Sequence, residues 1–303
     1  MSHVHADTVL PDRAVPALRK NSAGGMGRPP GVFGDSGTLG HVIGGSADRF
    51  IRRLATVRSF SHDERAALGT LCAVRTAIEA QTDVIVEGDE VTRGYIFEEG
   101  WGCRYRLLND GRRQILNIVV PGDFVGGLGG SMRIADHSVG TLTPCRVHTF
   151  PTAALVGLRR RFPALQDVFD WSARRDLAMI QERIVDIGRR TARERLAHLV
   201  LELMHRLRLV GLYDGRGFDL PLTQEAMGDA LGLSIVHVNR TLRRLNQGGL
   251  ICYRPGRLDV VDEDGLARIA DFDADYLHHS GSSPDANRGV VEAARARFHA
   301  PRR

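Results

Sequence analysis

The stretch 220–245, LPLTQEAMGDALGLSIVHVNRTLRRL, decides our interpretation of the fold. Thr223 is a candidate N-cap for a first short helix. The apolar positions of that helix share one face and are Ala226, Met227, Ala230 and Leu231. Gly232 supplies a left-handed turn and Ser234 can cap a second helix. Apolar positions spaced 3, 4 and 3 residues apart predict that the second helix buries Ile235, Val238, Leu242 and Leu245. Two short helices joined by a glycine turn make a helix-turn-helix unit.

The outer face of the second helix carries hydrogen-bonding and cationic side chains and no acid. Its members are Val236, His237, Asn239, Arg240, Arg243 and Arg244. Such a face suits a DNA groove, which has phosphates on both sides. In the major groove a planar arginine fork matches O6 and N7 of guanine, so we expect Arg240, near the middle of the helix, to read a base.

The remaining residues of this face suit other contacts. Asn239 is suited to adenine, Val236 to a thymine methyl group, and His237 to either a base or a phosphate. Arg243 and Arg244 lie one turn later, where we expect phosphate contacts. We add Thr223, the cap of the first helix, to the residues expected at the DNA.

A second basic element follows Gly248-Gly249. The runs 250–253 and 258–261 flank Arg254-Pro255-Gly256-Arg257 and predict a β-hairpin, the wing. We expect Arg254 and Arg257 at its tip to contact phosphate. The segment 189–257 holds twelve arginines and six acids, although the whole chain has a formal charge of only +5. An ordinary helical core with surface arginines is the alternative, but the order of caps, turn and basic hairpin favours a DNA reader.

A helical pattern upstream carries an apolar stripe. Leu177, Ile180, Ile184 and Ile187 are spaced 3, 4 and 3 residues apart, as in a coiled-coil seam. This spacing favours a contact between two helices of a dimer, although packing on the preceding strands is an alternative. Gly188, followed by Arg189-Arg190-Thr191, interrupts the pattern, and we expect a hinge there before another helix.

The chain between about Val84 and Phe150 breaks into short apolar runs separated by turn signals. Asp110-Gly111 lies between two such runs and predicts a hairpin. Strands this short at regular spacing favour a small β-barrel or jelly roll. A helical pattern from Asp48 to Ala73 precedes them.

These features resemble the Crp/Fnr family of bacterial transcription regulators, from about Phe50 to Ala270. The most specific part is 222–225 with the run 231–240, and the turns Glu87-Gly88-Asp89 and 121–124 support it more weakly. The resemblance implies an α+β fold with an N-terminal cyclic-nucleotide-binding-like β-roll, a long dimerisation helix and a C-terminal winged helix-turn-helix. It also implies a homodimer on palindromic promoter sites, contact with RNA polymerase, and Arg240 at the guanine-reading position.

We therefore expect five segments along the chain. They are a disordered extension (1–45), a sensor β-roll domain (46–160), a dimerisation helix (161–188), a winged helix-turn-helix DNA-binding domain (189–270) and a flexible tail (271–303). The extension is rich in glycine and has few large apolar residues to bury, so its composition cannot offset chain entropy.

The residues expected to bind a ligand in the β-roll differ from those of the family members that bind cyclic AMP. Family members that bind cyclic AMP carry a Glu after the Gly of the phosphate loop and an Arg-Ser pair near its end. Here Gly127 follows Gly126, and His137-Ser138 replaces the pair beside Asp136, whose charge would repel phosphate. A cyclic-nucleotide-responsive regulator of the same fold remains an alternative. No cysteine precedes Cys72, unlike the clustered N-terminal cysteines of the oxygen-sensing members, so we expect no cofactor and no metal, and the effector is unknown.

The sequence also lacks the marks of other protein classes. We find no phosphate-binding P-loop, no nucleophile elbow and no catalytic site, so we expect no enzyme. No run approaches about 18 apolar residues and no secretory signal is evident, so we expect a cytoplasmic protein without a membrane partner. We predict a sequence-specific DNA-binding regulator, an activator. The alternative from another class is a ligand-binding or enzymatic β-barrel protein whose C-terminal helices mediate only protein contacts.

Overall fold

The computed structural model of the chain describes residues 47–126 and 133–278. The predicted extension 1–45 and the loop residue Gly127 lie outside these residues. Helices α1 (Ala47–Leu54) and α2 (His62–Thr70) come first. Ser61 and Glu64 form a capping box at the start of α2, which fixes where that helix begins. No helix in the described ranges is both long and apolar enough to cross a membrane.

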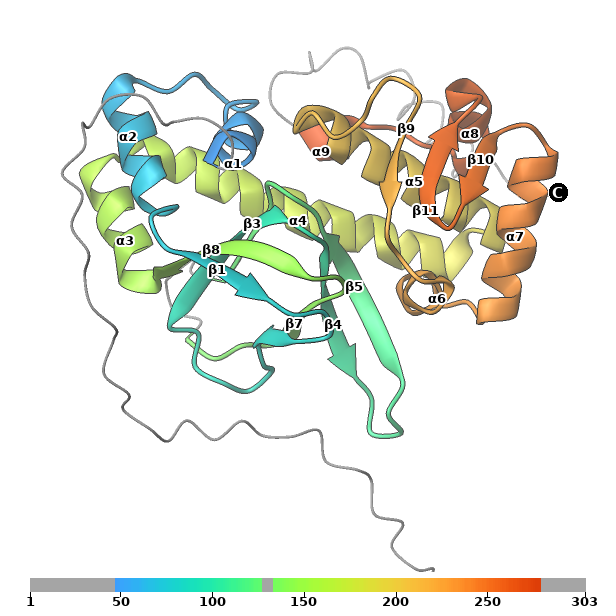
Figure 1. Cartoon of the computed structure of the whole chain (residues 1–303), viewed down its shortest axis with the longest axis horizontal. Coiled ribbons are helices and arrows are strands. Elements are labelled where there is room, and N and C mark those ends of the chain that lie inside the picture. Colours follow the sequence, from blue (N-terminus) through green and yellow to red (C-terminus); the bar gives the residue numbers. More distant parts are fainter. Residues whose placement is uncertain (1–46, 127–132, 279–303) are drawn as a thin grey trace, which may run out of the picture. The chain divides into compact units, whose positions relative to one another are not determined.

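Eight strands form a β-roll of two four-stranded antiparallel sheets (Figure 1). One sheet has the order β1-β8-β3-β6, with bounds Arg75–Ile78, Cys145–Pro151, Arg93–Glu99 and Phe124–Gly126. The other has the order β2-β7-β4-β5, with bounds Asp83–Ile85, Ser138–Thr141, Gly102–Leu107 and Arg113–Val119. The hairpin predicted at Asp110-Gly111 joins β4 to β5, and Gly111 takes a positive φ of 85° there. The predicted β-roll is confirmed.

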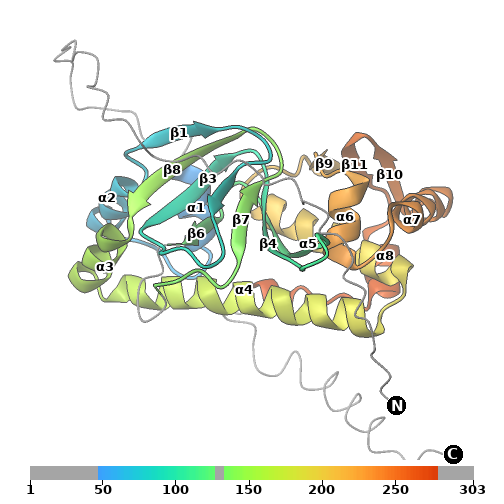
Figure 2. The same ribbon diagram turned by 90° about the horizontal axis from the view of Figure 1, so that it is seen from below.

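Three helices follow the roll: α3 (Thr152–Arg161), α4 (Ala164–Arg189) and α5 (Ala192–Leu209). Helix α4 corresponds to the predicted dimerisation helix, and the strands of the roll lie on one side of it (Figure 2). The predicted interruption at 188–191 is present, although α4 continues through Gly188 to Arg189. The chain leaves the helix at 190–191, because Thr191 forms a capping box with Glu194 that starts α5. A glycine inside a helix costs only about 1 kcal/mol, which packing can offset.

The predicted seam of α4 is exposed in the single chain. Leu177 and Ile184 are 55% and 66% exposed, Ile187 is also exposed, and Ile180 is half-buried. The opposite face, with Met179 among others, is buried. The stripe therefore does not pack on the strands of its own chain, which was the alternative explanation for its spacing.

The C-terminal part packs around α5 and contains the predicted helix-turn-helix and wing. Its elements are β9 (Gly217–Leu220), α6 (Gln224–Leu231), α7 (Ile235–Gln247), β10 (Ile251–Arg254), β11 (Gly256–Val260), α8 (Glu263–Ala270) and α9 (Asp275–His278). The three strands form one antiparallel sheet in the order β10-β11-β9. A cluster of buried apolar side chains joins α5, α6 and α7 with strands of this sheet.

The folded part of the chain extends beyond residue 270. The tail predicted to start at 271 begins instead with residues that pack on the helices. Leu277 is 1% exposed, and the Tyr276 hydroxyl donates a hydrogen bond to Glu202 at 3.3 Å. These large apolar and aromatic side chains explain the difference, because they gain free energy by burial.

A buried ion cluster joins the roll to α5. The Arg206 guanidinium, which has no exposed surface, lies 2.5 Å from an Asp123 carboxylate oxygen and 3.1 Å from one of Glu202. It also donates a hydrogen bond to the carbonyl of Ile118 at 2.7 Å. Arg53 of α1 pairs with the same Asp123 carboxylate. Burial lowers the pKa of Arg53, and the neighbouring charges of Arg175 and Arg206 lower it further.

Candidate nucleic-acid interface

The two helices of the predicted DNA reader are capped as the sequence predicts. The Thr223 hydroxyl accepts a hydrogen bond from the Ala226 amide at 3.0 Å, and Ser234 accepts one from the His237 amide at 3.3 Å. Gly232 ends α6 in the left-handed conformation, with φ 64°. Because both caps and the turn are local features, their geometry follows directly from these residues.

The buried face of α7 starts one turn later than predicted. Val238 and Leu245 have no exposed surface and Leu242 has 2%, which confirms three of the four predicted positions. Ile235 is 52% exposed, so its predicted burial is wrong. As the first residue of α7, it lies before the turn that packs on α6, and Thr241, which is 5% exposed, completes the buried stripe instead.

The outer face of α7 presents its cationic side chains to solvent. Val236 is 65% exposed, and His237, Arg240, Arg243 and Arg244 are exposed as well. Asn239 is half-buried and donates a hydrogen bond to the Gln224 side chain at 3.2 Å. The face therefore offers three arginines without an acid among them, whereas Asn239 would have to release Gln224 to reach an adenine.

The wing forms as predicted, but its two arginines have different surroundings. Arg254 and Arg257 pair across the hairpin, with a tight turn at Pro255-Gly256. The Arg257 guanidinium binds the carboxylates of three acids: Asp214, Asp219 and Asp259. Its hydrogen bond with Asp214 raises the pKa of Arg257. Arg257 therefore holds the wing to the segment before and within β9.

Arg254 is the more accessible of the two wing arginines. Its side chain is 67% exposed and has an ion pair with Asp259 at 3.0 Å. The Arg254 end of this pair lies in solvent, and the less exposed Asp259 keeps Arg257 as a second partner, so Arg254 can exchange Asp259 for a phosphate. We therefore expect Arg254, more than Arg257, to contact the DNA backbone.

Arg195 at the start of α5 is a residue that the sequence pattern did not reveal. Its guanidinium donates hydrogen bonds to the carbonyls of Leu231 and Ile187, each at 2.9 Å, and to that of Arg190 at 2.7 Å. These bonds tie the last turn of α6 to the end of α4. The sequence pattern does not indicate this contact, because its acceptors are backbone carbonyls and one of them, that of Leu231, lies 36 residues along the chain.

The residues of the expected ligand loop that the structure describes make their own contacts. The Ser138 hydroxyl accepts a hydrogen bond from the Glu87 amide at 3.0 Å, and a ring nitrogen of His137 lies 2.6 Å from an Asp136 oxygen. Arg104 of β4 forms an ion pair with Asp176 of α4 at 2.7 Å. The described part of this site thus presents His137 where the resemblance placed an arginine, with the Asp136 carboxylate beside it, which disfavours a phosphate ligand.

Comparisons with known proteins match both parts of the chain. A cyclic nucleotide-binding domain model matches residues 75–162, and a Crp-like helix-turn-helix domain model matches residues 194–269. The nitrogen fixation regulation protein FixK of Bradyrhizobium diazoefficiens is 32% identical over 218 residues, which cover 71% of this chain and 86% of that protein. The transcriptional activator protein FnrL of Cereibacter sphaeroides is 28% identical over 238 residues, 78% of this chain and 91% of that protein.

The solved structure of FixK2 from Bradyrhizobium japonicum has a similar fold. It matches with a TM-score of 0.59 at 22% identity, over 65% of this chain and 96% of that one. The expected arrangement of β-roll, long helix and C-terminal helix-turn-helix domain is confirmed.

Proposed function

Since the chain belongs to the Crp/Fnr family of DNA-binding transcription regulators, we propose that it acts as a homodimer that reads a two-fold symmetric promoter site through Arg240. The relatives named as transcriptional activators, such as FnrL, support activation, which we propose to involve contact with RNA polymerase in the cytoplasm. The observation that carries the proposal is the exposed, acid-free face of α7.

The shape and charge of α7 support reading in the major groove. The helix is anchored by Val238, Leu242 and Leu245, so its outer face is held rigidly by the domain core. Arg240 lies on that face, where its fork can meet O6 and N7 of guanine. Arg243, Arg244 and Arg254 surround this contact with positive charge, which favours phosphate on either side.

The exposed stripe of α4 supports the dimer. Leu177, Ile184 and Ile187 expose apolar surface at coiled-coil spacing, and an identical helix offers the same surface in return. A second copy of this chain is therefore the partner that fits the stripe. A two-fold dimer presents two α7 helices to successive major grooves, about 34–36 Å apart.

Replacing Arg240 with alanine tests the base-reading role. We expect Arg240→Ala to weaken binding to the preferred duplex by about 1–3 kcal/mol, because a bidentate contact to guanine is lost. Binding to random duplex should change much less, since phosphate contacts remain. The measurement is a fluorescence titration of both duplexes with each protein.

Arg254→Ala is the matched control, since it removes the same side chain from the wing. It should weaken both duplexes alike and reduce the slope of log affinity against log salt by about 1. An equal loss on both duplexes after Arg240→Ala would show that Arg240 contacts only phosphate.

A further inference from the structure

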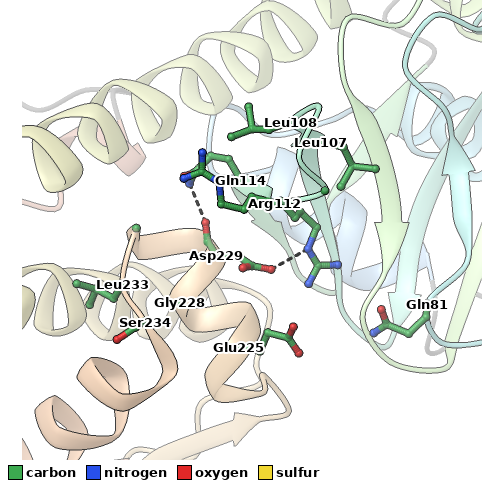
Figure 3. Close-up of a pocket in the computed structure, with 13 residues that line it drawn as sticks. Gln81, Leu107, Leu108, Arg112, Gln114, Glu225, Gly228, Asp229, Leu233 and Ser234 are labelled. Atoms are coloured by element: carbon green, nitrogen blue, oxygen red, sulfur yellow. Dashed lines mark hydrogen bonds and ion pairs between the residues drawn. The ribbon is translucent and has the colours of Figure 1, made fainter. Parts of the chain in front are cut away.

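The β4–β5 hairpin of the roll contacts the first helix of the DNA-reading unit (Figure 3). Nε of Arg113 lies 2.8 Å from a carboxylate oxygen of Asp229 in α6. The Gln114 side-chain amide donates a hydrogen bond to the backbone carbonyl of the same Asp229, also at 2.8 Å. Asp229 is therefore held through its side chain and its main chain, so both the position and the rotation of α6 are constrained.

Both partners of the ion pair are partly shielded from water. The side chains of Arg113 and Asp229 are each 24% exposed. Burial disfavours the charge of Arg113, yet the hydrogen bond with Asp229 raises the pKa of Arg113 overall. A pair in such a place is screened less than one at the surface, so it contributes more than an exposed pair.

The hairpin end of the contact is itself anchored within the roll. The Arg113 guanidinium lies 5.8 Å from the centre of the Tyr105 ring, and the Tyr105 hydroxyl donates a hydrogen bond to Asp83 of β2 at 2.8 Å. A continuous series of contacts therefore connects β2, the β4–β5 hairpin and α6. A shift of the hairpin strands moves the partner of Asp229.

The other end of the contact, in α6, lies next to α7, the recognition helix whose outer face is expected to read DNA. A pocket of about 890 Å³ separates the hairpin from the turn between α6 and α7, and its lining includes Leu108, Arg112, Gly228 and Ser234 (Figure 3). A Cβ at position 228 would lie only 2.5 Å from the Leu233 carbonyl oxygen, so α6 and the turn approach too closely to move separately. Because the buried residues of α6 and α7 belong to one apolar cluster, the orientation of α6 sets that of α7.

We propose that Arg113 and Asp229 are positioning residues that set the orientation of the recognition helix relative to the β-roll. The contact touches α6 and leaves the outer face of α7 exposed, so it supports DNA reading and does not block it. The inference rests on the proposed DNA-reading function.

Charge reversal in the full-length protein tests the proposal. The variants are Arg113→Asp, Asp229→Arg and the double exchange, and the readout is the ratio of affinities for the preferred and a random duplex. We expect each single reversal to lower this ratio about five- to tenfold, because like charges push the hairpin and α6 apart. The double exchange restores the pair with opposite polarity, so the ratio should return to within about twofold of the original.

Arg106→Asp is the control, because Arg106 lies on β4 of the same hairpin, is exposed, and pairs with Glu87 of the roll. This variant makes the same charge change away from α6, so its ratio of affinities should stay within about twofold of that of the unaltered protein. Melting temperatures recorded for all variants identify any that fail to fold. If the single reversals leave the ratio unchanged, or the folded double exchange fails to recover it, the positioning role is wrong. If the unaltered protein prefers no duplex, the proposed function itself fails.

Discussion

Replacing Asp123 with alanine is expected to lower the free energy of unfolding by about 3–5 kcal/mol, since it leaves a buried charge without its partner. Arg206, with no exposed surface, would lose its closest carboxylate at 2.5 Å, and Arg53 would lose its pair as well. The Val120 amide would also lose its acceptor at 3.0 Å. Denaturant titration followed by circular dichroism measures the effect.

Asp110→Ala is the matched control for this prediction. Asp110 lies at the tip of the β4–β5 hairpin and forms an ion pair with Arg112, but both side chains are more than half exposed. Its loss should lower the free energy of unfolding much less than Asp123→Ala does, because exposed pairs contribute little. Equal losses for the two variants would mean that the buried cluster does not hold the roll to α5.

The second large effect is expected from Ile184→Asp on the exposed stripe of α4. Ile184 is 66% exposed in the single chain, so the folded protomer should tolerate the change. In the proposed dimer two such carboxylates would be buried on apolar surface. We expect the dimer Kd to rise about a hundredfold or more, since two buried isoleucines are lost per dimer. Sedimentation equilibrium over a range of protein concentrations measures this.

Val74→Asp introduces the same charge at another exposed apolar position, 57% exposed and just before β1. That variant should associate like the unaltered protein. A dimer that survives Ile184→Asp unchanged would show that the stripe is not the contact between the two chains.

The local features of the DNA-reading unit could be predicted from the sequence because local residues determine them. Thr223 and Ser234 cap their helices and Gly232 makes the turn, each through neighbours a few positions away. The wing follows from the turn residues Pro255-Gly256 in the same way. The predicted burial of Ile235 was wrong because the periodicity of apolar residues does not show at which residue a helix begins to pack on its neighbour.

Contacts between segments far apart in the chain could not be predicted from the sequence. The pattern at Pro121-Gly122-Asp123 indicated a turn, but nothing in it indicated that Asp123 pairs with Arg206, far along the chain. The same holds for Arg195, whose acceptors are backbone carbonyls, and for Arg257, whose exposure depends on three acids brought together by the fold. Such pairs depend on tertiary geometry, which a single sequence does not display.

The most direct test of DNA reading by a two-fold dimer is selection of bound duplexes from a random pool by the full-length protein. We predict enrichment of a palindrome whose half-sites are about 10–10.5 base pairs apart, centre to centre, with a guanine in each half-site that Arg240→Ala no longer selects. A pool that shows no enriched sequence, or a single unpaired half-site, would contradict the account.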